Sequence, residues 1–308
     1  MSILVTGGAG FIGSHVCERL ISLGHDVVCV DNFDPYYDVS KKEENIRGLN
    51  MKVYRTDIRD MVSLRKIFSK HKIKKIVHLA AKAGVRNSIK EPLLYNQVNI
   101  NGTLNLLELA RASKVENFVF ASSSSVYGAN KKVPFSEDDA LHNIVSPYAA
   151  TKLIGEMYCK LYSRLHSLNV TCLRFFTVYG PRGRPDMMIY KLVDGIAKGK
   201  EIDFYGDGTS RRDYTYITDI VDGVVSTLDK NFRFEVINLG DSNPIELARL
   251  VQIVENKMGK KANLRMLPMP SSDVPVTFAD ISKAQKLFGY KPKIKIEEGI
   301  EEFVKWYK

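Results

Sequence analysis

Short apolar runs alternate with amphipathic stretches along the first two-thirds of the chain. Each run is brief, rich in β-branched residues and nearly free of polar positions, which is typical of strands that are covered on both faces. Six such runs predict strands, at residues 3–5, 27–30, 51–54, 76–79, 118–121 and 170–175.

The stretches between these runs place apolar residues at helical spacing. They predict helices at residues 11–23, 92–112 and 148–166, and one that begins after Asp60, whose side chain is a suitable N-cap. Strands and helices that alternate in this way predict an α/β fold with a doubly wound parallel sheet.

The pattern changes after residue 175. Glycine and proline become dense at residues 180–185 and 206–208, a further strand is predicted at 236–239, and helices follow at 245–258 and 296–307. We therefore expect a larger domain over residues 1–174, with a strand near 214–240 that returns to its sheet. A smaller C-terminal, substrate-binding lobe is expected over residues 175–213 and 241–308.

The composition narrows the class of protein. The 308 residues carry a formal net charge of +10, but the lysines are spread along the chain without the patterns of a nucleic-acid-binding surface. No apolar run reaches the roughly 18–20 residues of a membrane span. The N-terminus lacks the basic leader of a signal peptide. We therefore expect a cytoplasmic protein that binds neither nucleic acid nor membrane. The four cysteines favour buried free thiols over disulfides or metal ligands, and no metal site is expected.

A glycine-rich turn follows the first predicted strand and opens the first predicted helix. Gly7, Gly10 and Gly13 are spaced GxxGxxG. The first glycine permits a tight turn, the second lets a pyrophosphate approach the backbone, and the third lets the helix pack closely on the strand. Phe11 and Ile12 lie in the first turn of the helix, where unpaired N–H groups can bind the phosphates. In this context the motif predicts a dinucleotide site on a Rossmann fold.

Acidic residues follow the next two predicted strands. Asp31 ends the second strand, 18 residues after Gly13. A carboxylate there can accept hydrogen bonds from both ribose hydroxyls and would repel a 2′-phosphate, which favours NAD over NADP. Asp57 and Ile58, just past the third strand, are candidates for contacting the adenine, although Asp57 is equally well explained as a loop acid.

Tyr148 and Lys152 form a YxxxK motif, so their side chains share one face of a predicted helix. A phenol has a pKa of about 10, and a nearby ammonium is expected to lower the pKa of Tyr148 and make it a general base. A run of serines, residues 122–125, follows a predicted strand at the edge where α/β sheets bind ligands. A serine hydroxyl there can bridge the substrate oxygen and the tyrosine.

Taken in order, these motifs resemble those of the extended short-chain dehydrogenases/reductases and, more narrowly, of the nucleotide-sugar 4-epimerases. The resemblance covers nearly the whole chain and rests on Asp31 and on the strings GGAGFIG (7–13), LAA (79–81), SSSSVYG (122–128), YAATK (148–152) and RRDYTYITD (211–219). Two further strings, AGVRNS (83–88) and FFTVYGPRGRPDM (175–187), are most similar to those of the UDP-glucuronate 4-epimerases.

The resemblance implies a tightly bound NAD that is regenerated in each cycle. It makes Ser123 the catalytic hydroxyl beside Tyr148 and Lys152. Asn99 corresponds to a family asparagine near the nicotinamide, although an asparagine there could also simply bridge helices. The NAD-binding residues implied are Gly7, Gly10, Phe11, Ile12, Gly13, Asp31, Asn32, Asp57, Ile58, Leu79, Ala80, Ala81, Asn99, Tyr148 and Lys152.

Dehydratases and decarboxylases of this family carry carboxylates where this chain has Ser124 and Ser125, so the resemblance favours epimerisation through a 4-keto intermediate. A sugar carboxylate calls for a bidentate arginine. Arg184 is the first candidate and Arg86 the second, the alternative being that these arginines bind phosphate or face solvent. Thr177, where galactose-type 4-epimerases usually have Asn, also favours a uronate.

The rest of the substrate site is implied by position. Arg212 corresponds to the family arginine on the UDP pyrophosphate, and Asp273 is retained in a loop that has lost the family's glycine. The substrate-binding residues implied are Arg86, Ser123, Ser124, Tyr148, Thr177, Arg184, Arg212 and Asp273.

The function expected is NAD-dependent conversion of UDP-glucuronate to UDP-galacturonate. The alternatives are 4-epimerisation of UDP-glucose and UDP-galactose, a nucleotide-sugar oxidoreductase with net NAD(P)H turnover, and a non-catalytic dinucleotide sensor. The helices predicted at 92–112 and 148–166 resemble the pair through which this family forms homodimers.

Overall fold

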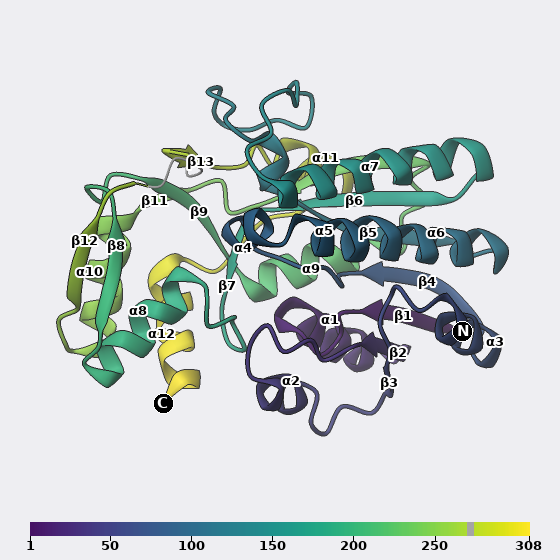
Figure 1. Cartoon of the computed structure of the whole chain (residues 1–308), viewed down its shortest axis with the longest axis horizontal. Coiled ribbons are helices and arrows are strands. Elements are labelled where there is room, and N and C mark those ends of the chain that lie inside the picture. The colour runs from purple at the N-terminus through teal and green to yellow at the C-terminus, as the bar shows by residue number, and fades with distance from the viewer. Residues whose placement is uncertain (270–273) are drawn as a thin grey trace.

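Seven parallel strands form the main sheet of the computed structural model, which describes residues 1–269 and 274–308. Neighbouring strands follow the order β10-β6-β5-β4-β1-β2-β3 (Figure 1). This order reverses direction next to β1, and such a reversal creates a ligand crevice at the carboxyl ends of the strands. The strands are β1 Ser2–Thr6, β2 Asp26–Asp31, β3 Lys52–Arg55, β4 Ile73–His78, β5 Asn117–Ser123, β6 Asn169–Phe175 and β10 Phe234–Leu239.

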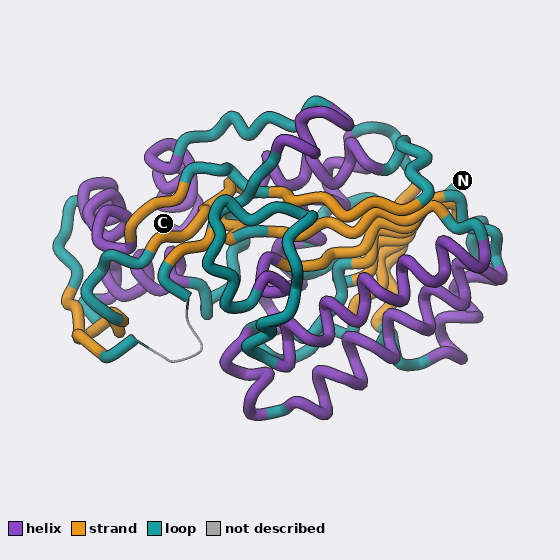
Figure 2. The backbone as a smooth tube through the Cα atoms, turned by 90° about the horizontal axis from the view of Figure 1, so that it is seen from above, coloured by secondary structure: helices purple, strands orange, loops and turns teal. Residues whose placement is uncertain are grey.

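Helices cover both faces of this sheet (Figure 2). Because successive side chains of a strand point to opposite faces, the fully buried neighbours Leu4 and Val5 enter different core clusters. Val5 packs with side chains of α1 and α9, and Leu4 with side chains of α3, α6 and α7. These layers confirm the predicted α/β class with a parallel sheet. The helices are α1 Phe11–Ser22, α3 Met61–Lys70, α6 Gly102–Ala112, α7 Pro147–His166 and α9 Ile217–Thr227.

Two local predictions are wrong. Strand β3 is not covered on both faces, because it lies at the edge of the sheet and leaves Lys52 and Val53 exposed. The helix predicted at 92–112 is not a continuous α-helix. It consists of α5 (Pro92–Asn96), a π-helical turn η1 (Gln97–Asn101) and α6, and a π-turn commonly marks a functional site. Asp60, in contrast, caps α3 as predicted, because its carboxylate accepts the Ser63 N–H.

The last third of the chain builds two smaller sheets beside the carboxyl edge of the main one (Figure 1). In the first, β9 pairs with β7, β11 and β13, and in the second β8 pairs with β12. The chain leaves the main sheet after β6, returns for α9 and β10, and leaves again. The elements of this part are β7 Thr177–Tyr179, β8 Glu201–Tyr205, β9 Arg211–Tyr216, β11 Pro244–Glu246, β12 Asn263–Leu267, β13 Val276–Thr277, α8 Met188–Lys198, α10 Leu247–Met258, α11 Ser282–Phe288 and α12 Ile296–Tyr307.

Short elements complete the carboxyl edge, namely α2 Val39–Asn45, α4 Val85–Lys90 and the 3₁₀-helix η2 Ser124–Tyr127. All four cysteines are free and buried. No helix within the described residues is both long and apolar enough to cross a bilayer.

Candidate active site

A cavity opens at the carboxyl ends of β1, β2, β4 and β5. Fifteen of the residues singled out in the sequence line it, together with neighbours such as Asp34, Tyr36 and Lys82. The fifteen are Gly7, Gly10, Phe11, Ile12, Gly13, Asp31, Asn32, Asp57, Ile58, Leu79, Ala80, Ala81, Tyr148, Lys152 and Arg184.

The glycine turn forms the floor of this cavity. Gly7 has a positive φ of 71°, and a Cβ built on it would lie 2.8 Å from the backbone nitrogen of Ala80. A Cβ on Gly13 would lie 2.0 Å from the carbonyl oxygen of Gly7. Neither position can therefore take a side chain. The bare backbone and the N-terminus of α1 offer N–H groups to an anion, and this arrangement fits a dinucleotide diphosphate.

Asp31 is buried at the end of β2 with its carboxylate fixed by backbone amides. Its Oδ2 accepts the Ala9 N–H at 3.1 Å and its Oδ1 accepts the Phe33 N–H at 2.8 Å. The fixed carboxylate fits the role of an acceptor for ribose hydroxyls.

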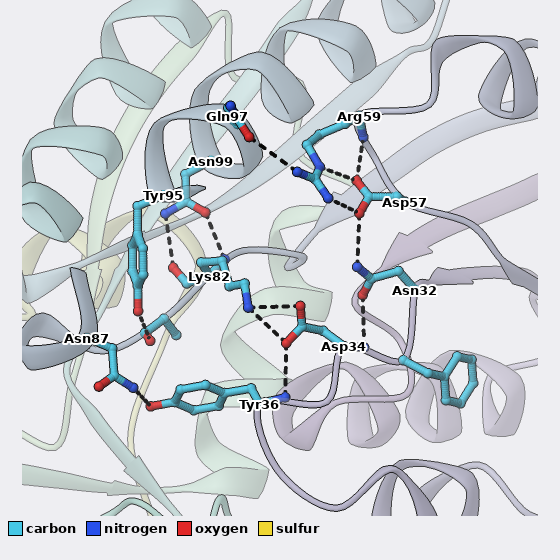
Figure 3. A network of polar contacts seen from close by, with 12 residues as sticks. Asn32, Asp34, Tyr36, Asp57, Arg59, Lys82, Asn87, Tyr95, Gln97 and Asn99 are labelled. Atoms are coloured by element: carbon cyan, nitrogen blue, oxygen red, sulfur yellow. Dashed lines mark hydrogen bonds and ion pairs between the residues drawn. The ribbon is translucent and has the colours of Figure 1, made fainter. Parts of the chain in front are cut away.

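Asp57 lies in a different environment. Its carboxylate binds the Arg59 guanidinium at 2.8 Å and accepts a hydrogen bond from the Asn32 side chain at 3.0 Å (Figure 3). The hydrogen bonds from Arg59 hold the pKa of Asp57 below its usual value. Asp57 is thus a paired acid at the cavity wall.

Tyr148 and Lys152 lie together on α7, whose N-cap Ser146 accepts the Ala149 N–H at 3.1 Å. The Lys152 ammonium donates to the Ala121 carbonyl at 2.7 Å and lies 5.9 Å from the centre of the Tyr148 ring. Burial lowers the pKa of Lys152 to about 8. Burial also raises the pKa of Tyr148, whereas the Ser123 hydrogen bond and the Arg184 charge act to lower it. The expected net lowering of the Tyr148 pKa by Lys152 is therefore not seen, because desolvation of the phenol dominates.

The serine run divides its contacts between two partners. Ser123 ends β5, hydrogen-bonds with Tyr148 and accepts the Ser125 N–H at 3.2 Å. Ser122 instead donates to Glu156 at 2.5 Å, and Ser124 begins η2. Ser123 is therefore the serine that the structure brings to Tyr148.

Behind the site lies a buried polar network that the sequence reasoning missed. Glu156, one helical turn beyond Lys152, receives two hydrogen bonds from Arg174 of β6, Nε to Oε1 at 2.9 Å and Nη2 to Oε2 at 2.8 Å. Arg174 also donates to the Tyr127 hydroxyl at 3.0 Å, which in turn donates to Asn238 of β10 at 2.7 Å. The network ties α7 to three strands. The spacing YxxxKxxxE was the available sequence signal.

Asn99 lies in the π-turn, is buried and does not line the cavity. Its Oδ1 accepts the Lys82 N–H at 2.8 Å, and its Nδ2 donates to the Lys82 carbonyl at 3.0 Å (Figure 3). The Nδ2 group also donates to the Thr151 hydroxyl at 3.0 Å. Asn99 thus bridges the loop after β4 and the helix α7.

The candidate substrate residues are more dispersed. Arg184 lines the cavity and forms an ion pair with Asp186 at 2.9 Å. The Arg86 guanidinium lies 4.3 Å from the centre of the Tyr205 ring. Arg212 donates to the Arg211 and Pro275 carbonyls, and Thr177 lies on β7 beside Tyr214 of β9. Asp273 lies outside the described residues.

The fold and the site together define the class of protein. Residues 3–240 match the family described as the NAD dependent epimerase/dehydratase family, and the chain belongs to this family. It is 46% identical to a UDP-glucuronate 4-epimerase of Thermodesulfobacterium geofontis, an alignment that covers 99% of this chain and 95% of the relative. The resemblance predicted from the motifs is thereby confirmed.

Two solved structures are similar over their whole length. A UDP-glucuronic acid 4-epimerase of Bacillus cereus, in complex with UDP-glucuronic acid and NAD, has a TM-score of 0.93 at 37% identity, covering 99% of this chain and 98% of that one. A UDP-glucose 4-epimerase of Thermotoga maritima, solved with UDP-glucose, also has a TM-score of 0.93 at 35% identity, covering 100% and 98%.

Proposed function

We propose that this chain catalyses NAD-dependent 4-epimerisation of a UDP-sugar through a 4-keto intermediate, converting UDP-glucuronate to UDP-galacturonate. The observation that carries the proposal is one cavity that joins the glycine turn, the Tyr148–Lys152 pair and the Arg184 guanidinium. The likeness to the UDP-glucuronate 4-epimerases of two other organisms supports it.

The glycine turn and Asp31 are the residues that would hold NAD. Gly7, Gly10 and Gly13 leave the backbone open to its diphosphate, and the amide-fixed carboxylate of Asp31 would accept its ribose hydroxyls. The other proposed NAD-binding residues either line the same cavity or, like Asn99, brace its wall. Bound NAD supplies the hydride acceptor and donor at the sugar C4. We assign residues 1–174, with the strand near 214–240, to the NAD-binding domain, and residues 175–213 and 241–308 to the UDP-sugar lobe.

Tyr148 is the proposed general base. Its Oη takes the proton of the sugar 4-hydroxyl. It returns the proton after the 4-keto sugar has rotated in the site to present its other face. Ser123, hydrogen-bonded to Tyr148, would hold the 4-oxygen in line with the phenol. Lys152 keeps a positive charge beneath the ring, 5.9 Å from its centre, and that charge favours the phenolate as the proton leaves.

Arg184 is the proposed ligand of the sugar carboxylate, because it lines the same cavity as Tyr148 and its guanidinium can bind a carboxylate with two hydrogen bonds. Arg86, Ser124, Thr177, Arg212 and Asp273 remain proposed substrate contacts. A neutral UDP-hexose is the second candidate substrate, since the fold is equally similar to a UDP-glucose 4-epimerase.

A direct assay tests this proposal. The purified protein is incubated separately with UDP-glucuronate and UDP-glucose, without added cofactor, and the C4 epimer of each is separated by chromatography. We expect UDP-galacturonate from the first reaction. If only UDP-glucose is epimerised, the substrate is the neutral sugar and not the uronate. If added NADH is consumed in proportion to product, the protein is a net oxidoreductase and not an epimerase.

We also propose a homodimer. Three exposed apolar side chains, Met157, Leu161 and Leu165, follow one another at four-residue spacing on α7, and Leu93 of the adjacent α5 is also exposed. Leu161→Lys should then yield a monomer in light scattering. Val62→Lys, at an exposed apolar residue on α3, is the matched control and should leave the dimer intact. A wild-type monomer would rule the proposal out.

The proposed location is the cytoplasm. Four free and buried thiols suit a reducing compartment, where disulfides rarely persist. Cell fractionation with an antibody tests this assignment, and recovery outside the cytoplasmic fraction would contradict it.

A further inference from the structure

Arg184 is held by a carboxylate of its own chain. Its Nε donates to Oδ1 of Asp186 and its Nη2 to Oδ2, each at 2.9 Å, and the Nη2 group also contacts the Met187 sulfur at 3.6 Å. Burial disfavours both charges. The hydrogen bonds between the two groups outweigh this effect of burial. The pKa of Asp186 is therefore lower, and the pKa of Arg184 higher, than the ordinary value of each group. The ion pair is therefore formed at neutral pH.

Asp186 is itself held from the dinucleotide side of the cavity. The Tyr36 hydroxyl donates to Oδ2 of Asp186 at 3.1 Å. The Asn87 side chain donates to the Tyr36 hydroxyl at 2.9 Å (Figure 3). The Tyr36 ring lies 5.9 Å from the Arg184 guanidinium carbon. Asn87, Tyr36, Asp186 and Arg184 thus form one chain of contacts, which we call the arginine brace.

The loop that carries Tyr36 is also fixed. The backbone N–H of Tyr36 donates to the Asp34 carboxylate at 3.0 Å, and that carboxylate pairs with the Lys82 ammonium at 2.9 Å (Figure 3). Tyr36, Asp34 and Lys82 all line the cavity. The brace therefore connects Tyr36, beside the proposed NAD site, to Arg184, the proposed ligand of the sugar carboxylate.

One edge of the guanidinium is left for a ligand. The contacts to Asp186 and Met187 use Nε and Nη2, and within the described residues Nη1 of Arg184 makes no hydrogen bond. An arginine fork can bind two carboxylates on separate edges. A free arginine side chain loses rotamer entropy when it binds a ligand. The carboxylate of Asp186 reduces this cost, because it already holds the Arg184 fork in one orientation.

We propose that Asp186, supported by Tyr36 and Asn87, is a positioning residue that determines selectivity for a uronate over a neutral sugar. It holds the Arg184 fork in one orientation, so that the sugar carboxylate meets a preorganised partner. The inference rests on the proposed function of Arg184 and deepens it. A neutral UDP-hexose makes no use of the fork and should be insensitive to the brace.

The experiment measures kcat and KM for UDP-glucuronate in Asp186→Asn, Tyr36→Phe and Arg184→Gln. UDP-glucose is measured in the same variants as a substrate or, where it is not turned over, as a competitive inhibitor. We expect Asp186→Asn to lower kcat/KM for the uronate by at least about tenfold, because the fork is no longer held, while the UDP-glucose constant changes by less than about twofold. Tyr36→Phe removes the hydroxyl that donates to Asp186 and accepts from Asn87, and it should lower the uronate kcat/KM by about fivefold.

Two further variants separate positioning from general damage. The double variant Tyr36→Phe/Asp186→Asn should be no worse than Asp186→Asn alone, because both changes act through the same fork. Asp229→Asn is the matched control: Asp229 pairs with Lys75 of β4, and neither residue lines the cavity. It should leave both constants unchanged.

The outcomes are distinguishable. If Arg184→Gln leaves the preference for UDP-glucuronate unchanged, the proposed role of Arg184 fails. If Arg184→Gln abolishes the preference but Asp186→Asn keeps it, only the brace is overturned. A lower KM for UDP-glucuronate in Asp186→Asn would also overturn it, since Asp186 would then compete with the substrate carboxylate.

Discussion

Replacement of the buried partners Glu156 and Arg174 tests how α7 is held against the main sheet. The two side chains are 5% and 3% exposed, so neither charge reaches bulk water. Glu156→Gln removes the carboxylate but keeps the shape of the side chain. Its amide oxygen can accept only one of the two Arg174 hydrogen bonds, and its amide nitrogen would oppose the other guanidinium nitrogen, so the Arg174 charge would stay buried without a counter-charge.

The expected magnitude follows from the hydrogen bonds that the substitution removes. Two hydrogen bonds between charged groups join Arg174 to Glu156, at 2.9 and 2.8 Å. Each contributes about 1.5–3 kcal/mol; Glu156→Gln removes one and weakens the other, because its acceptor is no longer charged, for a loss of roughly 2–5 kcal/mol. Breaking a buried ion pair by removing one partner lowers the free energy of unfolding by a similar amount, about 3–5 kcal/mol. We therefore expect a loss of about 3–5 kcal/mol for Glu156→Gln, and the same for Arg174→Met.

Urea unfolding followed by far-ultraviolet circular dichroism measures this loss. The double variant Glu156→Gln/Arg174→Met buries no unpaired charge and should lose less than the sum of the single variants, with a coupling of about 1.5–3 kcal/mol. A loss below about 1 kcal/mol in Glu156→Gln, or additive single losses, would refute the view that the pair secures α7.

Three further predictions concern the cavity and its surroundings. Gly13→Ala should abolish NAD retention, read from the absorbance of the purified protein, because the new Cβ would lie 2.0 Å from the Gly7 carbonyl oxygen; retained NAD would contradict the tight turn. Tyr148→Phe should lower turnover by at least about a hundredfold without loss of NAD, and unchanged turnover would remove Tyr148 as the base. Burial, with Asp213 and Asp219 nearby, raises the pKa of Asp241 to about 7, so the contribution of Asp241 to wild-type stability should fall as the pH rises from 4 to 7; Asp241→Asn should therefore stabilise more at pH 8 than at pH 4 in urea unfolding, and the opposite trend would refute the shift.

Much of the fold and of the site could be predicted because its signals are local in sequence. The glycine turn and the YxxxK motif each lie within a few consecutive residues; a helix follows the first, and the second lies within the first turns of a helix. The strand β3 was predicted, but its exposure at the sheet edge was not, because its apolar run resembles that of a central strand and the sheet order decides which strand is covered.

The unpredicted part of the site depends on contacts between distant segments. Tyr36 and Asp186 are 150 positions apart, and only the packed fold brings the phenol to the carboxylate. The sequence identified Arg184 but not the partner that orients it. The pKa of Tyr148 shows the same limit, because the burial that raises it arises from all the elements around the cavity.

The π-turn at Gln97–Asn101 also constrains how this chain can change during evolution. Such a turn holds one residue more than a regular helix would, so the loss of a single codon there would restore an uninterrupted α-helix. The helical segments on either side would keep their orientation, because the turn absorbs the extra residue, but the side chains within the turn would move. We expect a tolerated one-residue deletion in this segment to be much rarer than a substitution, because the amide of Asn99 would no longer reach both Lys82 and Thr151.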